Sequence, residues 1–142
     1  MTAKNNTSEN SIDKTAVLVI NLGTPDAPKT SEVRTYLREL LSSDRVLDIN
    51  PILRWLLLNL FILPFRPKKS AKAYQKIWFE EGSPLMFYSQ KLKKALSEQF
   101  AEENIHVELA MQCGNPSIKK SLDSLRVKGY SRIIVLTMYP QY

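Results

Sequence analysis

Residues 16–22 read Ala-Val-Leu-Val-Ile-Asn-Leu, a short and almost continuously apolar run that is rich in β-branched side chains. Such a run is typical of a strand that is buried on both faces, as the strands of parallel sheets are. Gly23-Thr24-Pro25-Asp26 follows with turn-forming residues that end the strand. The run therefore predicts the first strand of a parallel α/β sheet.

Helices and strands alternate beyond this strand. An N-cap at Thr30 and apolar residues at helical spacing predict an amphipathic helix that reaches Leu41. Asn50-Pro51 opens a nearly all-apolar helix, expected to be buried or to meet an apolar partner, which Pro64 should end. The remaining predicted elements are helices over 70–79 and 87–100, a strand over 106–111, a helix over 117–128 and a strand over 132–138. This order predicts an open parallel sheet with flanking helices and right-handed crossovers.

The 142 residues suffice for one domain. Residues 1–14 are polar and predict a disordered leader, so the folded lobe should span 15–142. A doubly wound sheet normally continues with a helix after each strand, whereas this chain stops four residues after its third predicted strand. We therefore expect a lobe that is truncated after that strand.

Composition excludes several classes of protein. The single cysteine, Cys113, permits no internal disulfide and no zinc or iron–sulfur site, and it favours a reducing, cytoplasmic location. The lone histidine, His106, has no partner for a metal site or a catalytic triad and should be structural. No secretory signal is present, and no uncharged stretch is longer than 55–65, which falls short of the ~20 residues that span a bilayer. No glycine-rich nucleotide motif occurs.

Positive charge is concentrated in one part of the chain. The net charge is +6, but residues 54–94 hold nine basic and two acidic residues, a local charge of +7. Within them, an apolar stretch is followed directly by the cationic residues of 66–72. This order suits a flat apolar ligand that bears carboxylates, or an anionic membrane surface, although a solvated basic face is the plainer alternative.

Ligands of open parallel sheets bind just past the carboxyl ends of the strands. The three segments at those positions here are 23–26, 112–116 and 139–142. The aromatic residues around Gly82-Ser83-Pro84 would either form walls of the same cleft or belong to the core, and they are Trp78, Phe79, Phe87 and Tyr88.

Five motifs in order resemble the N-terminal half of ferrochelatase. They are Asn21-Leu22-Gly23-Thr24-Pro25-Asp26, Arg66-Pro67 with Ser70-Ala71-Lys72-Ala73-Tyr74, Glu81-Gly82-Ser83-Pro84-Leu85, Gly114-Asn115-Pro116-Ser117 and Tyr139-Pro140-Gln141-Tyr142. The resemblance implies a Rossmann-like chelatase fold of two similar lobes, of which this chain is the first. It also implies insertion of ferrous iron into a porphyrin during haem biosynthesis, with those two molecules as substrates and no tightly bound cofactor.

The resemblance also implies a porphyrin-binding site. Leu22 would face the porphyrin, Arg66 would meet a propionate, and Tyr74 and Ser83 would line the pocket. Residues 53–72 would form a lip of the cleft and a region of peripheral contact with the inner face of the membrane.

Two departures from the family pattern stand out. Gln112 and Cys113 replace an Arg-Tyr pair, so Gln112 offers the porphyrin a neutral amide in place of a charge-assisted contact. The histidine and glutamate of the family's metal site lie beyond the last motif. We therefore expect no catalytic and no metal-binding residue in this chain, and no activity without the second lobe.

Two alternatives belong to other classes. One is a non-catalytic porphyrin- or haem-binding module that retains the lip. The other is a basic module that docks on anionic lipid or nucleic acid through 54–94. Nucleic acid is not the partner we expect, and binding that weakens steeply with salt would reveal it.

Overall fold

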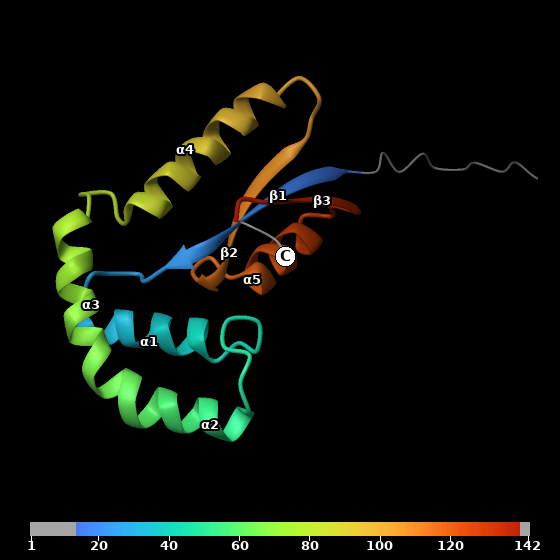
Figure 1. The fold of residues 1–142 in the computed structure, drawn as a ribbon. Helices are drawn as coiled ribbons and strands as arrows, with labels where there is room; N and C mark the ends of the chain where they lie inside the picture. The colour runs from blue at the N-terminus through green and yellow to red at the C-terminus, as the bar shows by residue number, and fades with distance from the viewer. Residues whose placement is uncertain (1–13, 140–142) are drawn as a thin grey trace, which may run out of the picture.

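The computed structural model describes residues 14–139. The predicted leader, except Lys14, and the last three residues of the final motif lie outside the described residues. Three parallel strands form the sheet, in the order β2-β1-β3. They are β1 (Thr15–Thr24), β2 (His106–Gly114) and β3 (Arg132–Thr137) (Figure 1). The predicted α/β class and parallel sheet are confirmed.

Two helices cover opposite faces of β1 and β2. Helix α4 (Pro84–Gln99) packs on the face that carries Val19, Leu109 and Met111. Helix α5 (Ile118–Val127) covers the other face, where its Leu125 is fully buried with Leu18 and Ala110 of the sheet. The alternation of side chains along a strand thus gives the central strand an apolar core on both sides, as its sequence predicts.

The remaining helices lie beyond the carboxyl end of β1 (Figure 1). They are α1 (Thr30–Leu41), α2 (Pro51–Leu56), the π-helix η1 (Leu57–Ile62) and α3 (Leu63–Ile77). Helix α1 packs against α3, and Gln75 Nε2 of α3 donates a hydrogen bond to the carbonyl of Pro28 ahead of α1. These helices therefore lie around the carboxyl ends of β1 and β2.

The expected helix end at Pro64 is wrong. Helices α2, η1 and α3 follow one another without a break from Pro51 to Ile77, with Pro64 in the first turn of α3 and Pro67 inside it. The π-helical turn explains how the chain passes the first proline, because the N–H of Leu63 reaches the carbonyl of Leu58, five residues back. The separate helix predicted over 70–79 is therefore the second half of α3.

Other predicted boundaries need smaller corrections. Thr30 is the first residue of α1, and the cap position is Lys29, which makes no side-chain cap. Asn50 does open α2 as predicted, because its Oδ1 accepts a hydrogen bond from the N–H of Ile52. Helix α4 begins at Pro84, three residues early, and Tyr88 on its predicted inner stripe is 62% exposed.

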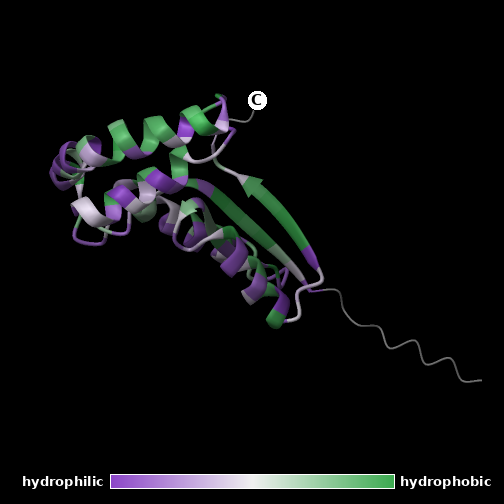
Figure 2. Ribbon diagram, turned by 90° about the horizontal axis from the view of Figure 1, so that it is seen from below, coloured by the Kyte–Doolittle hydropathy of each residue, from purple (hydrophilic) through white to green (hydrophobic). Residues whose placement is uncertain are grey.

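Strand β3 is paired on one side only within the described residues. Ile134, Val135 and Leu136 are each exposed by 40% or more, although they are consecutive and so lie on both faces of the sheet. Figure 2 shows this strand almost wholly hydrophobic. Among residues 14–139, nothing therefore fully covers this apolar strand.

Candidate functional site

The carboxyl ends of β1 and β2 meet at two glycines. Gly23 pairs with Cys113 and Thr24 pairs with Gly114 in the parallel register. Both glycines have positive φ, +118° and +91°. Two of the three predicted post-strand segments, 23–26 and 112–116, are therefore side by side, as predicted.

Two carboxylates bind segment 112–116, one from α1 and one from segment 23–26. Glu39 Oε2 of α1 accepts a hydrogen bond from the N–H of Gly114 at 2.9 Å, and Asp26 Oδ2 accepts one from Asn115 Nδ2 at 2.9 Å. A hollow of about 270 Å³ opens between them and is lined by polar groups of α1 and both loops, among them Glu32 and Tyr36. No sequence pattern singles out Glu39 or Tyr36, which have the spacing of ordinary residues of an amphipathic helix.

Tyr36 connects α1 to the end of β1. Its hydroxyl donates a hydrogen bond to the carbonyl oxygen of Gly23 at 3.2 Å, and the residue is buried. Burial, followed by the proximity of Tyr74, raises the pKa of Tyr36 to about 12. Helix α1, which carries Tyr36, also packs against α3, which carries Tyr74.

The two predicted residues of α3, Tyr74 and Arg66, differ in burial and in contacts. Tyr74 is half-buried, burial raises the pKa of its phenol, and its ring packs edge-on against Trp78 with centroids 6.0 Å apart. Arg66 lies two helical turns earlier, is exposed, and makes no ion pair with any described residue. Among the described residues, no hydrogen bond or ion pair joins Arg66 to the other four predicted residues, so the shared helix is what relates it to Tyr74.

Ser83 is buried and caps α4. Its Oγ accepts a hydrogen bond from the N–H of Met86 at 3.1 Å. The aromatic residues around it divide into two groups, because Phe79, Phe87 and Tyr88 contact one another while Trp78 contacts Tyr74. The capping role was not predicted for Ser83, although a serine before Pro and three residues before Met86 is a recognisable start of a helix.

Leu22 and Gln112 lie near the carboxyl ends of their strands. Leu22 is 37% exposed and follows Asn21, whose Nδ2 donates to Ser89 Oγ of α4 at 3.1 Å. Gln112 is half-buried, and its Oε1 is a buried oxygen without a hydrogen-bond partner in the described part of the chain. Cys113 beside it is buried, and burial raises the pKa of its thiol.

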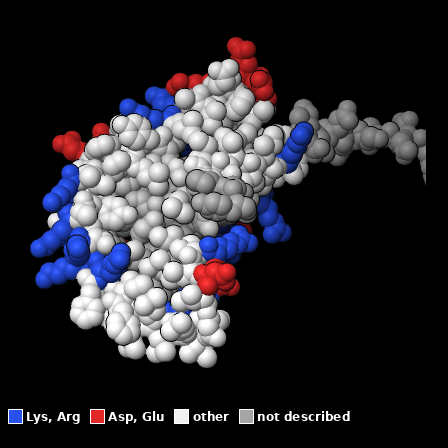
Figure 3. Space-filling model, viewed as in Figure 1, with Lys and Arg blue, Asp and Glu red and all other residues white. Residues whose placement is uncertain are grey.

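The apolar helix predicted to be buried or to meet an apolar partner is mostly exposed. Ile52, Trp55, Phe61 and Phe65 are more than half exposed, whereas Leu58 is buried. Figure 2 shows α2 and η1 as mainly hydrophobic, and Figure 3 shows Lys and Arg gathered over α3 next to an uncharged surface over α2. The apolar surface and the cations are therefore neighbours in space as well as in sequence.

Some of the local positive charge is neutralised by acids from outside 54–94. Arg54 pairs with Asp44 at 2.6 Å, and Lys93 pairs with Glu108. On α3, Lys68, Lys69 and Lys72 line a hollow of about 250 Å³ together with Phe65, and they form no ion pair with a described residue. The field expected from the sequence is thus concentrated on α3.

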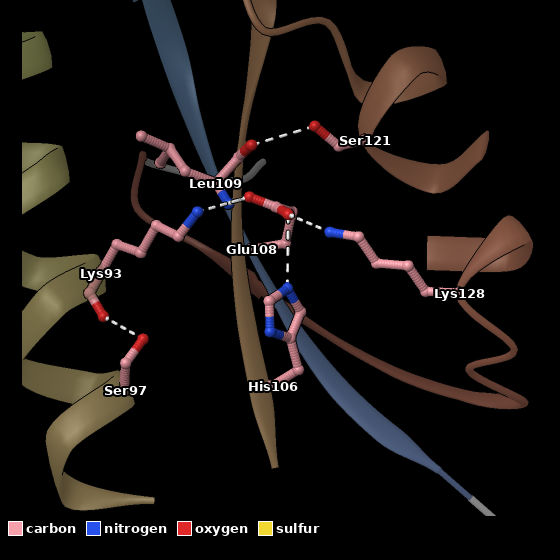
Figure 4. A network of polar contacts seen from close by, with 7 residues as sticks. All are labelled: Lys93, Ser97, His106, Glu108, Leu109, Ser121 and Lys128. Atoms are coloured by element: carbon pink, nitrogen blue, oxygen red, sulfur yellow. Dashed lines mark hydrogen bonds and ion pairs between the residues drawn. The ribbon is translucent and has the colours of Figure 1, made fainter. Parts of the chain in front are cut away.

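A second polar network lies in the amino-terminal half of β2, away from these strand ends (Figure 4). Glu108 accepts from Lys93 of α4, and its other oxygen lies 3.3 Å from His106 Nε2 and 3.8 Å from Lys128 Nζ. His106 stacks on Tyr130 with centroids 5.2 Å apart. These contacts agree with the structural role predicted for His106.

Among residues 14–139, no three His, Cys, Asp or Glu side chains are grouped so that they could hold a metal ion. Within the same span, no helix has the length and apolar character needed to cross a bilayer.

Comparison with known proteins decides the family. The ferrochelatase family model matches residues 14–142. The chain belongs to the ferrochelatase family. Curated ferrochelatases with high similarity come from Marinomonas sp. (strain MWYL1), 52% identical over 129 residues, and from Herminiimonas arsenicoxydans, 51% identical over 134 residues. The ferrochelatase of Serratia proteamaculans (strain 568) is 47% identical over 130 residues.

These ferrochelatases are much longer than the present chain. The matches cover 89%, 93% and 92% of this chain but 39%, 36% and 40% of the three relatives. The matched part is the N-terminal portion of each ferrochelatase. The open parallel sheet with flanking helices agrees with a Rossmann-like lobe of that family.

Proposed function

We propose that this chain is the first lobe of a ferrochelatase-type enzyme and supplies the porphyrin-binding wall for the insertion of ferrous iron. The observation that carries the proposal is the packing of α1 against α3 beside the end of β1, where Tyr36 of α1 bonds to Gly23 next to Leu22. It connects a predicted contact on β1 to the helix that carries two others. An exposed apolar surface and free cations adjoin on the same group of helices.

The five predicted residues offer different contacts to a porphyrin. Leu22 is exposed enough to pack on an apolar macrocycle, and the unpaired guanidinium of Arg66 suits a propionate. The half-buried Tyr74 offers an aromatic ring, and the buried Ser83 has a hydroxyl hydrogen that remains available while its oxygen caps α4. The Oε1 of Gln112 is a buried acceptor that no described residue uses.

Metal insertion also requires a base for the pyrrole protons and a ligand that delivers the iron. The described residues offer no grouped donors for that task. We therefore assign the metal-site histidine and glutamate to the remainder of the enzyme, and expect this chain to be inactive alone. Ferrous iron and porphyrin are substrates in this proposal, and no tightly bound cofactor is needed.

A metal-insertion assay tests the assignment. The chain would be assayed alone and after mixing with the separately produced C-terminal portion of the Marinomonas ferrochelatase. We expect turnover only in the mixture. Turnover by the chain alone would overturn the assignment of the metal chemistry to the missing portion.

The porphyrin site is tested separately by absorbance titration. Arg66→Gln and Tyr74→Leu should each weaken binding, whereas Lys119→Gln on α5, which also removes one charge, should not. A titration without a spectral change at micromolar porphyrin would reject the wall. Binding that is retained while the mixture stays inactive would favour the second candidate, a non-catalytic porphyrin- or haem-binding module.

The exposed apolar residues of β3 suggest a surface that the second lobe covers. Ile134 and Leu136 on one face and Val135 on the other are uncovered, and such apolar surface is normally buried against another layer. We propose that the rest of the enzyme covers part of it. Ile134→Lys with Leu136→Lys should then prevent assembly of the two portions in size-exclusion chromatography.

We further propose cytoplasmic placement with peripheral contact at the inner face of the membrane through 53–72. Exposed Trp55, Phe61 and Phe65 would enter the interface while the lysines of α3 face anionic head groups. In liposome flotation, Leu56→Ser with Leu60→Ser should abolish binding. Val127→Ser with Val135→Ser, two exposed sites elsewhere, is the control and should bind like wild type.

A further inference from the structure

Helix α1 borders two hollows. One is lined by carboxylates, as described above, and the other, on the opposite side of the helix, is basic. Arg34 and Arg38 of α1, Asn59 of η1, and Leu63 and Pro64 at the start of α3 line it, with a volume of about 250 Å³. The two carboxylates Glu32 and Glu39 of α1 line the other hollow instead. Charges of opposite sign are thus segregated onto two faces of one helix.

Arg34 and Arg38 stand one turn apart on that helix, where like charges repel. Neither guanidinium forms an ion pair or a side-chain hydrogen bond with any residue of 14–139, and both residues are exposed. No acidic side chain lines the hollow. The hollow therefore concentrates two cations without a counter-charge from the described chain.

The opposite wall adds a donor and an apolar surface. Asn59 Nδ2 donates one hydrogen to the carbonyl of Trp55 at 2.9 Å, which leaves its second amide hydrogen unused. Leu63 is buried and Pro64 carries no N–H, so these two residues add apolar surface to the hollow and no further hydrogen-bond donor. The π-helical turn that presents Asn59 is a rare element that is frequent at functional sites.

We propose that Arg34, Arg38 and Asn59 form a binding site for a phosphate group. Two planar guanidinium forks and one amide hydrogen match several oxygens of a tetrahedral, doubly charged anion better than a single carboxylate. The phosphate would come from free phosphate or from a phospholipid head group. Leu60 and Phe61, which follow Asn59 and are more than half exposed, favour the lipid. The site is independent of porphyrin binding.

NMR of the arginine Nε–H and asparagine amide signals tests the proposal. The full chain would be titrated with sodium phosphate, and with sodium chloride at matched ionic strength. We expect a saturating shift for Arg34, Arg38 and Asn59 in phosphate only, with a Kd on the order of millimolar. Vesicles of phosphatidylcholine with phosphatidylglycerol form the second arm, and broadening of the same signals there identifies a lipid source.

Matched variants separate a built site from a diffuse field. Arg34→Gln with Arg38→Gln should weaken phosphate binding by about tenfold or more, as loss of charge-assisted hydrogen bonds predicts. Lys120→Gln with Arg126→Gln, two exposed residues of α5 whose replacement also removes two charges, should leave it unchanged. Equal weakening by both pairs, or no saturating shift in either arm, would overturn the proposal. Arg38→Gln alone, with a well-dispersed spectrum, replaces the pair if the double variant does not fold.

Discussion

The carbonyl oxygen of Cys113 occupies the space next to Gly23 in which any larger residue would begin its side chain. A Cβ atom on Gly23 would lie 1.7 Å from that oxygen, and one on Gly114 would lie 2.7 Å from the carbonyl oxygen of Thr24. Both distances are far shorter than van der Waals contact. The two strand ends that flank the candidate site can therefore meet only with glycine at both positions.

Gly23→Ala should be strongly destabilising. Gly82 is a matched control, because its φ is +125° but nothing lies within 4 Å of its missing Cβ. Gly82→Ala should cost about 1–2 kcal/mol from backbone strain alone. Gly23→Ala should cost at least about 3 kcal/mol, because backbone must also move. Urea denaturation measures both, and equal losses would contradict the role of the close contact.

Stability should fall at high pH through Tyr36. Burial raises the pKa of Tyr36 to about 12 from 10, so the folded state favours the neutral phenol. The neutral phenol therefore contributes about 2–3 kcal/mol to the free energy of unfolding. This contribution is complete below pH 10 and is lost as the pH rises through about 12. Tyr36→Phe should remove this fall and, below pH 10, cost about 1 kcal/mol for the lost bond to Gly23. Parallel stability curves for the two proteins between pH 10 and 12 would refute the assignment.

Glu108 should stabilise the fold at neutral but not at acidic pH. Burial alone would raise the pKa of Glu108, but hydrogen bonds from Lys93, the N–H of Leu109 and His106 outweigh it and lower the pKa below 4.5. The stabilisation is therefore complete above pH 4.5 and disappears as the pH falls through the lower folded value.

The Glu108→Gln variant checks this network. It should lose about 1–3 kcal/mol of unfolding free energy at pH 7, and the difference from wild type should shrink in acid. Asp123→Asn breaks the exposed pair with Lys119 and should have a much smaller effect. A deficit for Glu108→Gln that does not change with pH would argue against an ionised network.

Replacing Gln112 should separate stability from ligand binding. Gln112→Met removes a buried oxygen that has no partner, so the unfolding free energy should stay within about 1 kcal/mol of wild type or rise. Gln75→Met, which removes the hydrogen bond to Pro28, should instead lower it. If Gln112 contacts the porphyrin as proposed, Gln112→Met should weaken the absorbance titration. Unchanged porphyrin affinity would remove Gln112 from the site.

Local patterns in the sequence determined much of the fold. The apolar run before Gly23 predicts the central strand, and Asn50 predicts the start of α2, because both signals depend on neighbouring residues alone. The predicted order of strands and helices gives the parallel sheet and brings 23–26 beside 112–116. The residues of the predicted porphyrin site came from motif resemblance, and their contact with porphyrin stays a prediction.

Only the tertiary structure decided what those elements face. Glu39 bonds to Gly114, which is 75 residues away in the sequence. Tyr36 bonds to Gly23 through its hydroxyl, whereas the helical pattern indicates only that its ring faces inward. The apolar helix is exposed because burial depends on what packs against it, and it passes Pro64 because a π-turn moves the hydrogen bonds by one residue. Periodicity encodes which side of an element is apolar, whereas the partner of that side is set by contacts between distant segments.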